Sequence, residues 1–308
     1  MNTLSPNFKD ALSNVSTVSL RRSHLPGLDG IRALAVLSVV AYHFGWSWIR
    51  GGFLGVDLFF VLSGFLITSL LLEEQIESGR LALVAFWGRR ARRLLPALFL
   101  MLAVVILVPL LVSQFGDPAS VAGIDLSLLH GFGLSSFFYF ANWFVIASGQ
   151  NYFAGFSAPS PLLHTWSLAI EEQFYLLWPI LVLWLARGGV LVRRRVGITV
   201  SILIAGGSSI LMASLYAPTS NRINFVYNAT FTRLFDLAAG AALAWMVVQR
   251  PSERLNVARA NLVGAVALLG IVAAMVWSGD SVGTPRSFMF YGGFLVCAVL
   301  AHGSKRRQ

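Results

Sequence analysis

Two residues near the start of the chain have the types and the spacing for acid/base chemistry. Arg32 and His43 are eleven residues apart, so on an α-helix they return to nearly the same face, about 16 Å apart along the axis. A guanidinium stays charged, whereas an imidazole changes its charge near neutral pH. One helix face can therefore present a fixed cation and a proton-transferring group. A neutral histidine held by a backbone carbonyl or an aromatic neighbour is the structural alternative for His43.

Two adjacent carboxyl groups lie well inside a later apolar stretch. Glu171 is seven residues after His164 and shares its helix face, while Glu172 points about 100° away, with Leu168 and Tyr175. Neighbouring carboxylates repel in a low dielectric, so one of the two is expected to hold a proton or to pair with a cation. Acids that only complement a helix dipole lie in the first turn. The depth of this pair therefore favours acid/base chemistry.

A run of arginines precedes Pro96 and contains Arg89, Arg90, Arg92 and Arg93. Guanidinium groups bind phosphate oxygens in pairs and remain charged, so this run predicts a phosphate clamp. The alternative is the ordinary positive flank of a membrane helix.

Other ionisable residues in apolar stretches have structural interpretations. Asp29 follows a Pro-Gly pair and is interpreted as the N-cap of the first helix. Arg233 and Asp236 are three residues apart, the spacing of an ion pair within one helix. Asp57 is a further carboxyl at membrane depth, where a charge costs on the order of 3 kcal/mol.

The elements that carry these groups are predicted to be membrane helices. Of the 308 residues, 56% are hydrophobic and 12% are charged, which does not suit a water-soluble surface. A further apolar segment, 124–147, is interrupted by two glycines and an asparagine. We predict an all-α integral membrane protein with about eight transmembrane helices plus one re-entrant or interfacial segment. The eight apolar runs are Ile31–Trp48, Phe53–Leu72, Leu94–Val112, Leu162–Ala186, Val196–Tyr216, Thr230–Val248, Leu262–Trp277 and Phe288–Ala301.

The positions of lysine and arginine predict the orientation. Most of the 23 basic residues fall in alternate connections between the runs, which is the pattern of cytoplasmic loops. Residues 1–25 are then a polar cytoplasmic tail, 26–302 a membrane domain and 303–308 a basic cytoplasmic end. The segment 124–147 must return to its own side, as a re-entrant, interfacial or short hairpin segment, because one crossing would move the later arginines outside.

The same pattern excludes other partners and sites. A net charge of +10 is typical of nucleic-acid binding proteins, but here the charge is divided among loops, so no nucleic-acid partner is expected. The single cysteine, Cys297, allows neither an intramolecular disulfide nor a thiolate metal site. No metal is predicted.

Several of these segments together resemble the acyltransferase 3 family of integral-membrane acyltransferases, which acylate hydroxyls of cell-surface polysaccharides, peptidoglycan, lipid-linked sugars and some secondary metabolites. The resemblance extends from residue 25 to about residue 302. It is specific because several long motifs occur in the family's order. The matching segments are 25–44, 52–67, the arginine run to Pro96 and 164–179, with 231–240 as a looser match.

The resemblance implies a donor and a set of roles. The donor would be cytoplasmic acyl-CoA, with acetyl-CoA expected first, and the acceptor a carbohydrate or lipid-linked hydroxyl in the cell membrane. The family's motifs of a basic residue ten positions before a histidine, and of Arg-x-x-Arg, fall on Arg32 and His43 and on Arg90 and Arg93. Arg90 and Arg93 would hold the nucleotide phosphates, while Arg32 and His43 would line the path of the thioester arm. His43 would be general base or acyl carrier, and Glu172, or Glu171 in its place, would orient it or handle the proton.

Family members ordinarily continue through two further helices, the last with a Tyr-Ser-x-Tyr-Leu-x-His-type segment, which this sequence is expected to lack. Two other functions are therefore retained. A proton-coupled secondary transporter could use His43 and Glu172 as a relay. An inactive, truncated family member, acting with a partner polypeptide or as an oligomer, is the third hypothesis.

Overall fold

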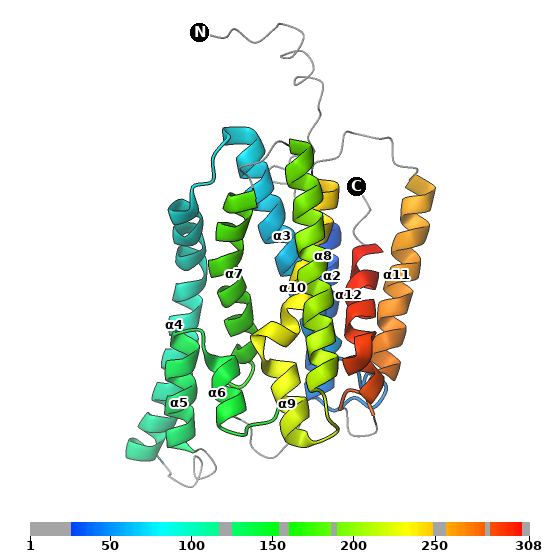
Figure 1. Cartoon of the computed structure of the whole chain (residues 1–308). Helices are drawn as coiled ribbons and strands as arrows, with labels where there is room; N and C mark the ends of the chain where they lie inside the picture. The colour runs from blue at the N-terminus through cyan, green and yellow to red at the C-terminus, as the bar shows by residue number, and fades with distance from the viewer. Residues whose placement is uncertain are drawn as a thin grey trace, which may run out of the picture.

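The computed structural model describes residues 26–116, 125–153, 160–185, 190–248, 257–280 and 284–303. Every regular element in these ranges is a helix, so the all-α prediction is confirmed (Figure 1). The predicted tail 1–25 and nearly all of the basic end lie outside the described residues. The helices are α2 Pro26–His43, α3 Leu54–Ser78, α4 Leu83–Phe115, α5 Leu126–Phe137, α6 Ala141–Ala147, α7 Thr165–Leu185, α8 Val190–Leu215, α9 Ser220–Asn228, α10 Thr230–Val247, α11 Val257–Trp277, a π-helical turn η2 Met289–Gly293 and α12 Phe294–Gly303.

Four helices in the described ranges are long and apolar enough to cross a membrane, judged by length and composition. They are α3, α4, α7 and the part of α8 from Arg193 onward. The count of about eight is not confirmed; the described parts of α11 and of the η2–α12 segment give the shorter apolar stretches Gly264–Trp277 and Met289–Ala298. Helix α2 ends at His43, five residues before the predicted end at Trp48. Just after it, Gly45 takes a left-handed φ of 69°, a conformation that commonly ends helices.

The segment 124–147 forms two short helices rather than one crossing. Tyr139, between α5 and α6, has a φ of 57°, which breaks the helix. Figure 1 shows both helices in the same lower half of the bundle. The structure therefore matches the short-hairpin alternative. The Asn142 side chain fixes α6 to the start of α10 by donating to the Asn228 carbonyl at 3.1 Å and to Thr230 Oγ1 at 3.0 Å.

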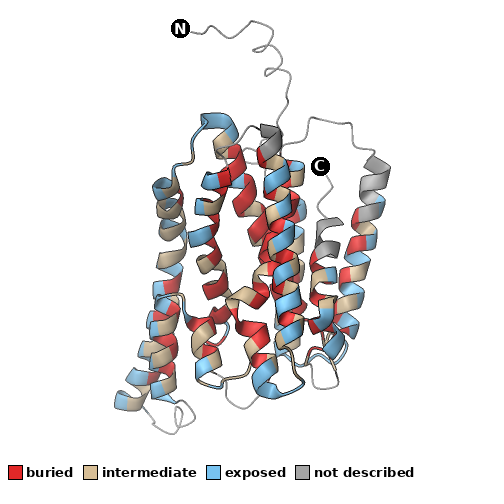
Figure 2. Ribbon diagram, viewed as in Figure 1, coloured by how far each residue is buried: buried red, intermediate tan, exposed pale blue. Residues whose placement is uncertain are grey.

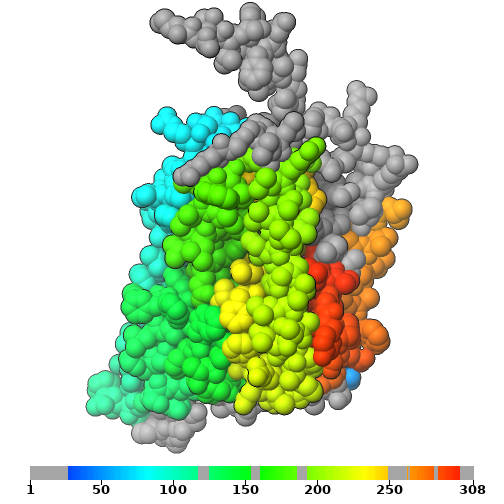
Figure 3. Space-filling model, in the orientation of Figure 1, coloured from blue at the N-terminus to red at the C-terminus, as the bar shows by residue number. Residues whose placement is uncertain are grey.

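Helices α3 and α10 form the centre of the bundle. Nearly every residue of α10 from Thr232 to Trp245 is buried, and Figure 2 shows buried residues concentrated on these two helices. In Figure 3 only a small part of α10, in yellow, is visible between α7 and α8. Helix α4 is the opposite case, since few of its side chains are buried. An exposed apolar surface of this kind is what lipid contact requires.

The ends of the helices separate the predicted site residues. The α3–α4 connection, the end of α7 and the end of α10 lie at one end of the bundle, the upper end in Figure 1. Helices α2 and α3 are antiparallel, because Gly55 packs on Ala35 while Gly52 packs on Ser38. His43, at the end of α2, therefore belongs to the lower end.

Candidate functional site

An ion pair between α4 and α7 brings together two of the predicted residues. Arg90 Nη2 lies 3.3 Å from Glu172 Oε1, and the two side chains are 24% and 15% exposed. The Arg90 guanidinium carbon also lies 3.6 Å from the centre of the Tyr175 ring. Of the two adjacent glutamates, Glu172 is thus the one that pairs with a cation. Stacking on the ring fixes the plane of the guanidinium, which suits it to recognise a planar or tetrahedral oxyanion.

Glu171 lies beside this pair and is held by two hydroxyl groups. Ser63 Oγ of α3 donates to Glu171 Oε2 at 2.9 Å, and the Tyr175 hydroxyl donates to the same oxygen at 2.8 Å. The other oxygen, Oε1, makes no hydrogen bond within the described residues and keeps accessible surface. The charges of Arg90 and Arg32 both act on this carboxyl. Glu171 is therefore an oriented acceptor with one open oxygen.

Arg32, on α2, forms its ion pair within its own helix and not with this cluster. Its Nη1 lies 3.2 Å from Asp29 Oδ1, with both side chains partly exposed. The interpretation of Asp29 as an N-cap is wrong, because α2 begins at Pro26 and Asp29 falls in its first turn. Proline is well suited to the first helical position, so the helix starts three residues before the aspartate. An acid in the first turn still complements the helix dipole.

His43 lies away from this cluster and is exposed. Its Nδ1 is 2.8 Å from the Val39 carbonyl, and its ring meets the edges of Tyr42 and Tyr152 at centroid distances of 5.4 and 5.5 Å. These are the partners of the structural alternative, although the ring is not buried. A carbonyl only accepts, so Nδ1 carries the hydrogen in the neutral ring and Nε2 keeps its lone pair. His43 can therefore act as a base through Nε2.

His164 is a neighbour of His43 in the lower half of the bundle. It retains exposed surface, yet many protein atoms surround it. Burial lowers the pKa of His164, and the charge of His43 lowers it further. The hydrogen bond with the Pro161 backbone acts in the opposite direction and raises the pKa.

The predicted link between His43 and the glutamates is not made in this structure. Glu172 pairs with Arg90, and Glu171 is held by Ser63 and Tyr175. A cavity of about 820 Å³ lies between α11 and the η2–α12 segment, and neither His43 nor the two glutamates line it. The continuous passage from the arginines to His43 stays a prediction.

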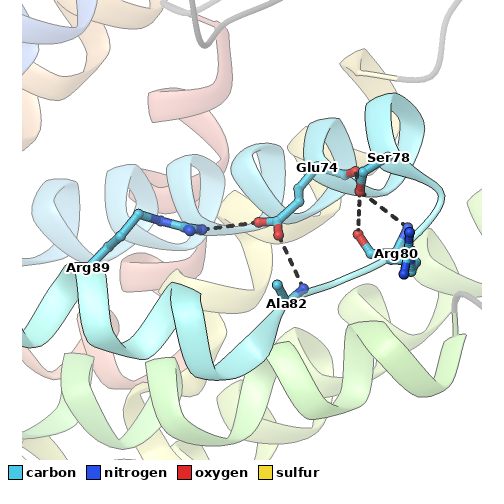
Figure 4. Close-up of polar contacts among 5 residues, drawn as sticks. All are labelled: Glu74, Ser78, Arg80, Ala82 and Arg89. Carbon is cyan, nitrogen blue, oxygen red and sulfur yellow. Dashed lines mark hydrogen bonds and ion pairs between the residues drawn. The ribbon is translucent and has the colours of Figure 1, made fainter.

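The arginine run divides into residues with different surroundings. Arg89 Nη2 contacts Glu74 Oε2 at 3.2 Å, while Glu74 Oε1 accepts from the Ala82 backbone at 3.1 Å (Figure 4). This ion pair joins α3 to α4 beside their connection. Arg89 therefore has the structural role of a positive residue that flanks a membrane helix. Arg93 is exposed and forms no ion pair with the described residues. It is therefore accessible to a ligand.

A buried ion cluster was only partly predicted. The expected pair within α10 is present, with Arg233 Nη2 3.3 Å from Asp236 Oδ2, but Asp57 Oδ1 of α3 is closer, at 2.9 Å. All three side chains are at most 2% exposed. The signal in the sequence was Asp57 itself, since a carboxyl in an apolar span needs a cation. Which helix supplies the cation depends on packing.

Comparisons with known proteins give one family and several relatives. A family model described as an acyltransferase domain matches residues 25–308. Peptidoglycan O-acetyltransferase OatA of Listeria monocytogenes is 39% identical over 296 residues, which cover 92% of this chain and 44% of the relative. The putative peptidoglycan O-acetyltransferase YrhL of Bacillus subtilis is 40% identical over 287 residues, 90% of this chain and 42% of the relative.

A putative O-acetyltransferase of Staphylococcus aureus is 37% identical over 284 residues, covering 90% of this chain and 44% of the relative. The chain thus spans less than half the length of the curated relatives it matches. No solved structure matches it.

Proposed function

Because this chain belongs to the acyltransferase family whose domain model it matches, we propose that it is a membrane O-acyltransferase. The donor would be acyl-CoA, acetyl-CoA in the first instance, and the acceptor a hydroxyl of the cell envelope. The relatives are named peptidoglycan O-acetyltransferases, which favours a glycan acceptor; a lipid-linked sugar or a secondary metabolite presents the same hydroxyl.

The observation that carries this proposal is the packing of Arg90 between Glu172 and the Tyr175 ring. A guanidinium held by a carboxylate and an aromatic face is preorganised, so a phosphate can bind it with little loss of side-chain entropy. The donor's phosphates would lie on Arg90 and Arg93, with the acyl arm directed along α2 past Arg32. The proposal places the arginine end at the cytoplasm, where the donor is made, and the amino terminus on the same side.

His43 would perform the proton transfer at the other end of α2. Its Nε2 accepts the proton of the acceptor hydroxyl while the hydroxyl oxygen attacks the thioester carbonyl. The carbon–sulfur bond breaks, and the thiolate of coenzyme A takes up one proton. Acyl transfer onto Nε2 followed by transfer to the hydroxyl gives the same balance. In both routes the hydrogen bond from Nδ1 to Val39 keeps Nε2 free.

The test is transfer of radiolabelled acetyl from acetyl-CoA to a cell-envelope extract by the purified protein in a bilayer of membrane lipids. We expect His43→Ala to lose on the order of 100-fold or more in rate, the usual contribution of a general base. His130→Ala is the matched control, since His130 is an exposed histidine on α5, and it should label acceptor at the wild-type rate.

A His43→Ala protein that labels acceptor as fast as wild type would refute the role of His43. A wild-type protein that neither binds acetyl-CoA nor labels any acceptor, but takes up a solute in response to a proton gradient, would replace the acyltransferase proposal with the transporter hypothesis. If the protein needs a second polypeptide, acetyl transfer should appear only when the two polypeptides are purified together.

A further inference from the structure

The ion cluster between α3 and α10 contains one more carboxyl group than cations. Arg233 Nη2 lies 2.9 Å from Asp57 Oδ1 and 3.3 Å from Asp236 Oδ2, and the three side chains are 0%, 2% and 0% exposed. No other lysine, arginine or histidine of the described residues forms an ion pair with either aspartate. With both carboxyl groups ionised, the cluster would carry a net charge of −1.

The surroundings of the cluster do not balance that charge. Four aromatic rings, of Phe60, Tyr227, Phe235 and Phe294, lie with centres 4.8–5.5 Å from the Arg233 guanidinium carbon. Their faces carry negative partial charge, so they stabilise the arginine and not a second carboxylate. A buried, uncompensated charge costs several kcal/mol, and taking up a proton is the usual way to avoid that cost.

The polar atoms of the cluster also have unused hydrogen-bonding capacity. Both oxygens of Asp57, both oxygens of Asp236 and the Nη2 of Arg233 are buried without a hydrogen bond of good geometry among the described residues. The ion-pair contacts are short, but the guanidinium hydrogens are not directed at the carboxyl oxygens. A proton on one carboxyl gives the cluster a donor as well as a neutral charge.

Two tyrosine rings lie between this cluster and His43. The Tyr227 ring lies 4.8 Å from the Arg233 guanidinium carbon and stacks on Tyr152 at 5.5 Å; the Tyr152 ring in turn lies 5.5 Å from that of His43. Both tyrosine hydroxyls are buried and make no hydrogen bond within the described residues. Burial raises the pKa of Tyr152, which lies outside the helices, so it stays a hydroxyl.

From these observations we propose that Asp57, Arg233 and Asp236 form a one-proton binding site. With one proton held by one of the two carboxyl groups, the cluster is neutral; without it, the cluster carries a charge of −1. Besides the two tyrosines, the titratable group facing the cluster is Cys297 of α12, across a cavity of about 10 Å³ that Asp57 also lines. It is neutral as a thiol, so it does not replace the missing cation.

The proton itself is tested by infrared spectroscopy of the purified protein in lipid at neutral pH. A buried protonated carboxyl gives a C=O stretching band separate from the carboxylate bands, and the band shifts in D₂O. We expect the band in wild type and its loss in both Asp57→Asn and Asp236→Asn, because each variant leaves one carboxylate facing one arginine. Asp29→Asn, which changes an exposed acid, is the control and should keep the band.

Absence of the band in wild type, or its persistence in both asparagine variants, would overturn the site. The wild-type measurement decides this even if a variant does not fold.

The measurement does not use acyl transfer, so its outcome is independent of the proposed function.

Discussion

Neighbouring arginines of one run have different surroundings, and the difference follows from the helix face each occupies. Arg89 and Arg90 point about 100° apart on α4. Arg89 reaches Glu74 at the α3–α4 connection, whereas Arg90 reaches Glu172 and the Tyr175 ring on α7. Of these two arginines, only Arg90 lies among the groups proposed to bind the donor, so its geometry should matter more to donor binding than that of Arg89.

Replacing Arg90 by lysine separates charge from geometry. Lysine keeps the positive charge but loses the planar group that stacks on Tyr175 and binds two oxygens at once. We expect the KM for acetyl-CoA of Arg90→Lys to rise about tenfold, equivalent to about 1.4 kcal/mol. Arg89→Lys should leave KM within about twofold of wild type. Equal effects of the two substitutions on KM in a labelling assay would contradict the role of Arg90.

Ser63 and Tyr175 are expected to act as a unit, because both donate to Glu171 Oε2. Removing one donor, as Ser63→Ala or Tyr175→Phe, should cost about 1 kcal/mol of unfolding free energy. The double variant should differ from the sum of the two single variants by at least about 0.5 kcal/mol, as groups that share a partner do. Thermal unfolding in detergent measures this cycle. Strict additivity would show that the two hydroxyls do not share the carboxylate.

Among the elements, α3 and α10 depend on two glycines for their close approach. A Cβ at Gly64 would collide with the Leu237 carbonyl, and one at Gly240 with the Val61 carbonyl. The backbones therefore touch at this crossing, as small residues allow between membrane helices. The same contact brings Asp57 of α3 within reach of Arg233 of α10.

Gly64→Ala and Gly240→Ala should each destabilise the protein by about 1–3 kcal/mol, the usual range for overpacking. The matched control is Gly206→Ala in α8, where a Cβ meets no atom within 4 Å. There alanine should leave stability unchanged or raise it by up to about 1 kcal/mol, through its better helix propensity. The melting temperature in detergent distinguishes the two sites. A stable Gly64→Ala protein would mean that the helices have room to separate.

At the scale of the molecule, the bundle has two chemically different ends. Ser78, which ends α3, lies at the upper end in Figure 1, and Ser220, which begins α9, lies at the lower end. In a Cys297→Ala background we expect Ser78→Cys to react with a membrane-impermeant maleimide only from the cytoplasm and Ser220→Cys only from outside. Reaction of both from the same side would contradict the orientation that the arginines predict.

The sequence predicted those features that depend on one helix at a time. Run length and polarity identified the helical class. The α3–α4 connection and the ends of α7 and α10, beside which arginine-rich stretches of the sequence fall, lie at one end of the bundle. Spacing predicted the Arg233–Asp236 pair. It did not predict Asp57 as the closer partner of Arg233, or Glu172 as the partner of Arg90. These pairs join helices far apart in the chain, and periodicity shows which face of a helix is polar but not which helix it meets.

Helix α4 is longer than a bilayer is thick. Its 33 residues extend about 50 Å, against a hydrocarbon layer of about 30 Å, and its apolar run, Leu94–Val112, accounts for about 28 Å. The turns that carry Arg89, Arg90 and Arg93 therefore stand among lipid head groups. There the phosphates of anionic lipids offer these guanidinium groups the same oxygens that a nucleotide does. If acyl-CoA is the donor, we expect anionic lipids of the surrounding leaflet to compete with it for these guanidinium groups.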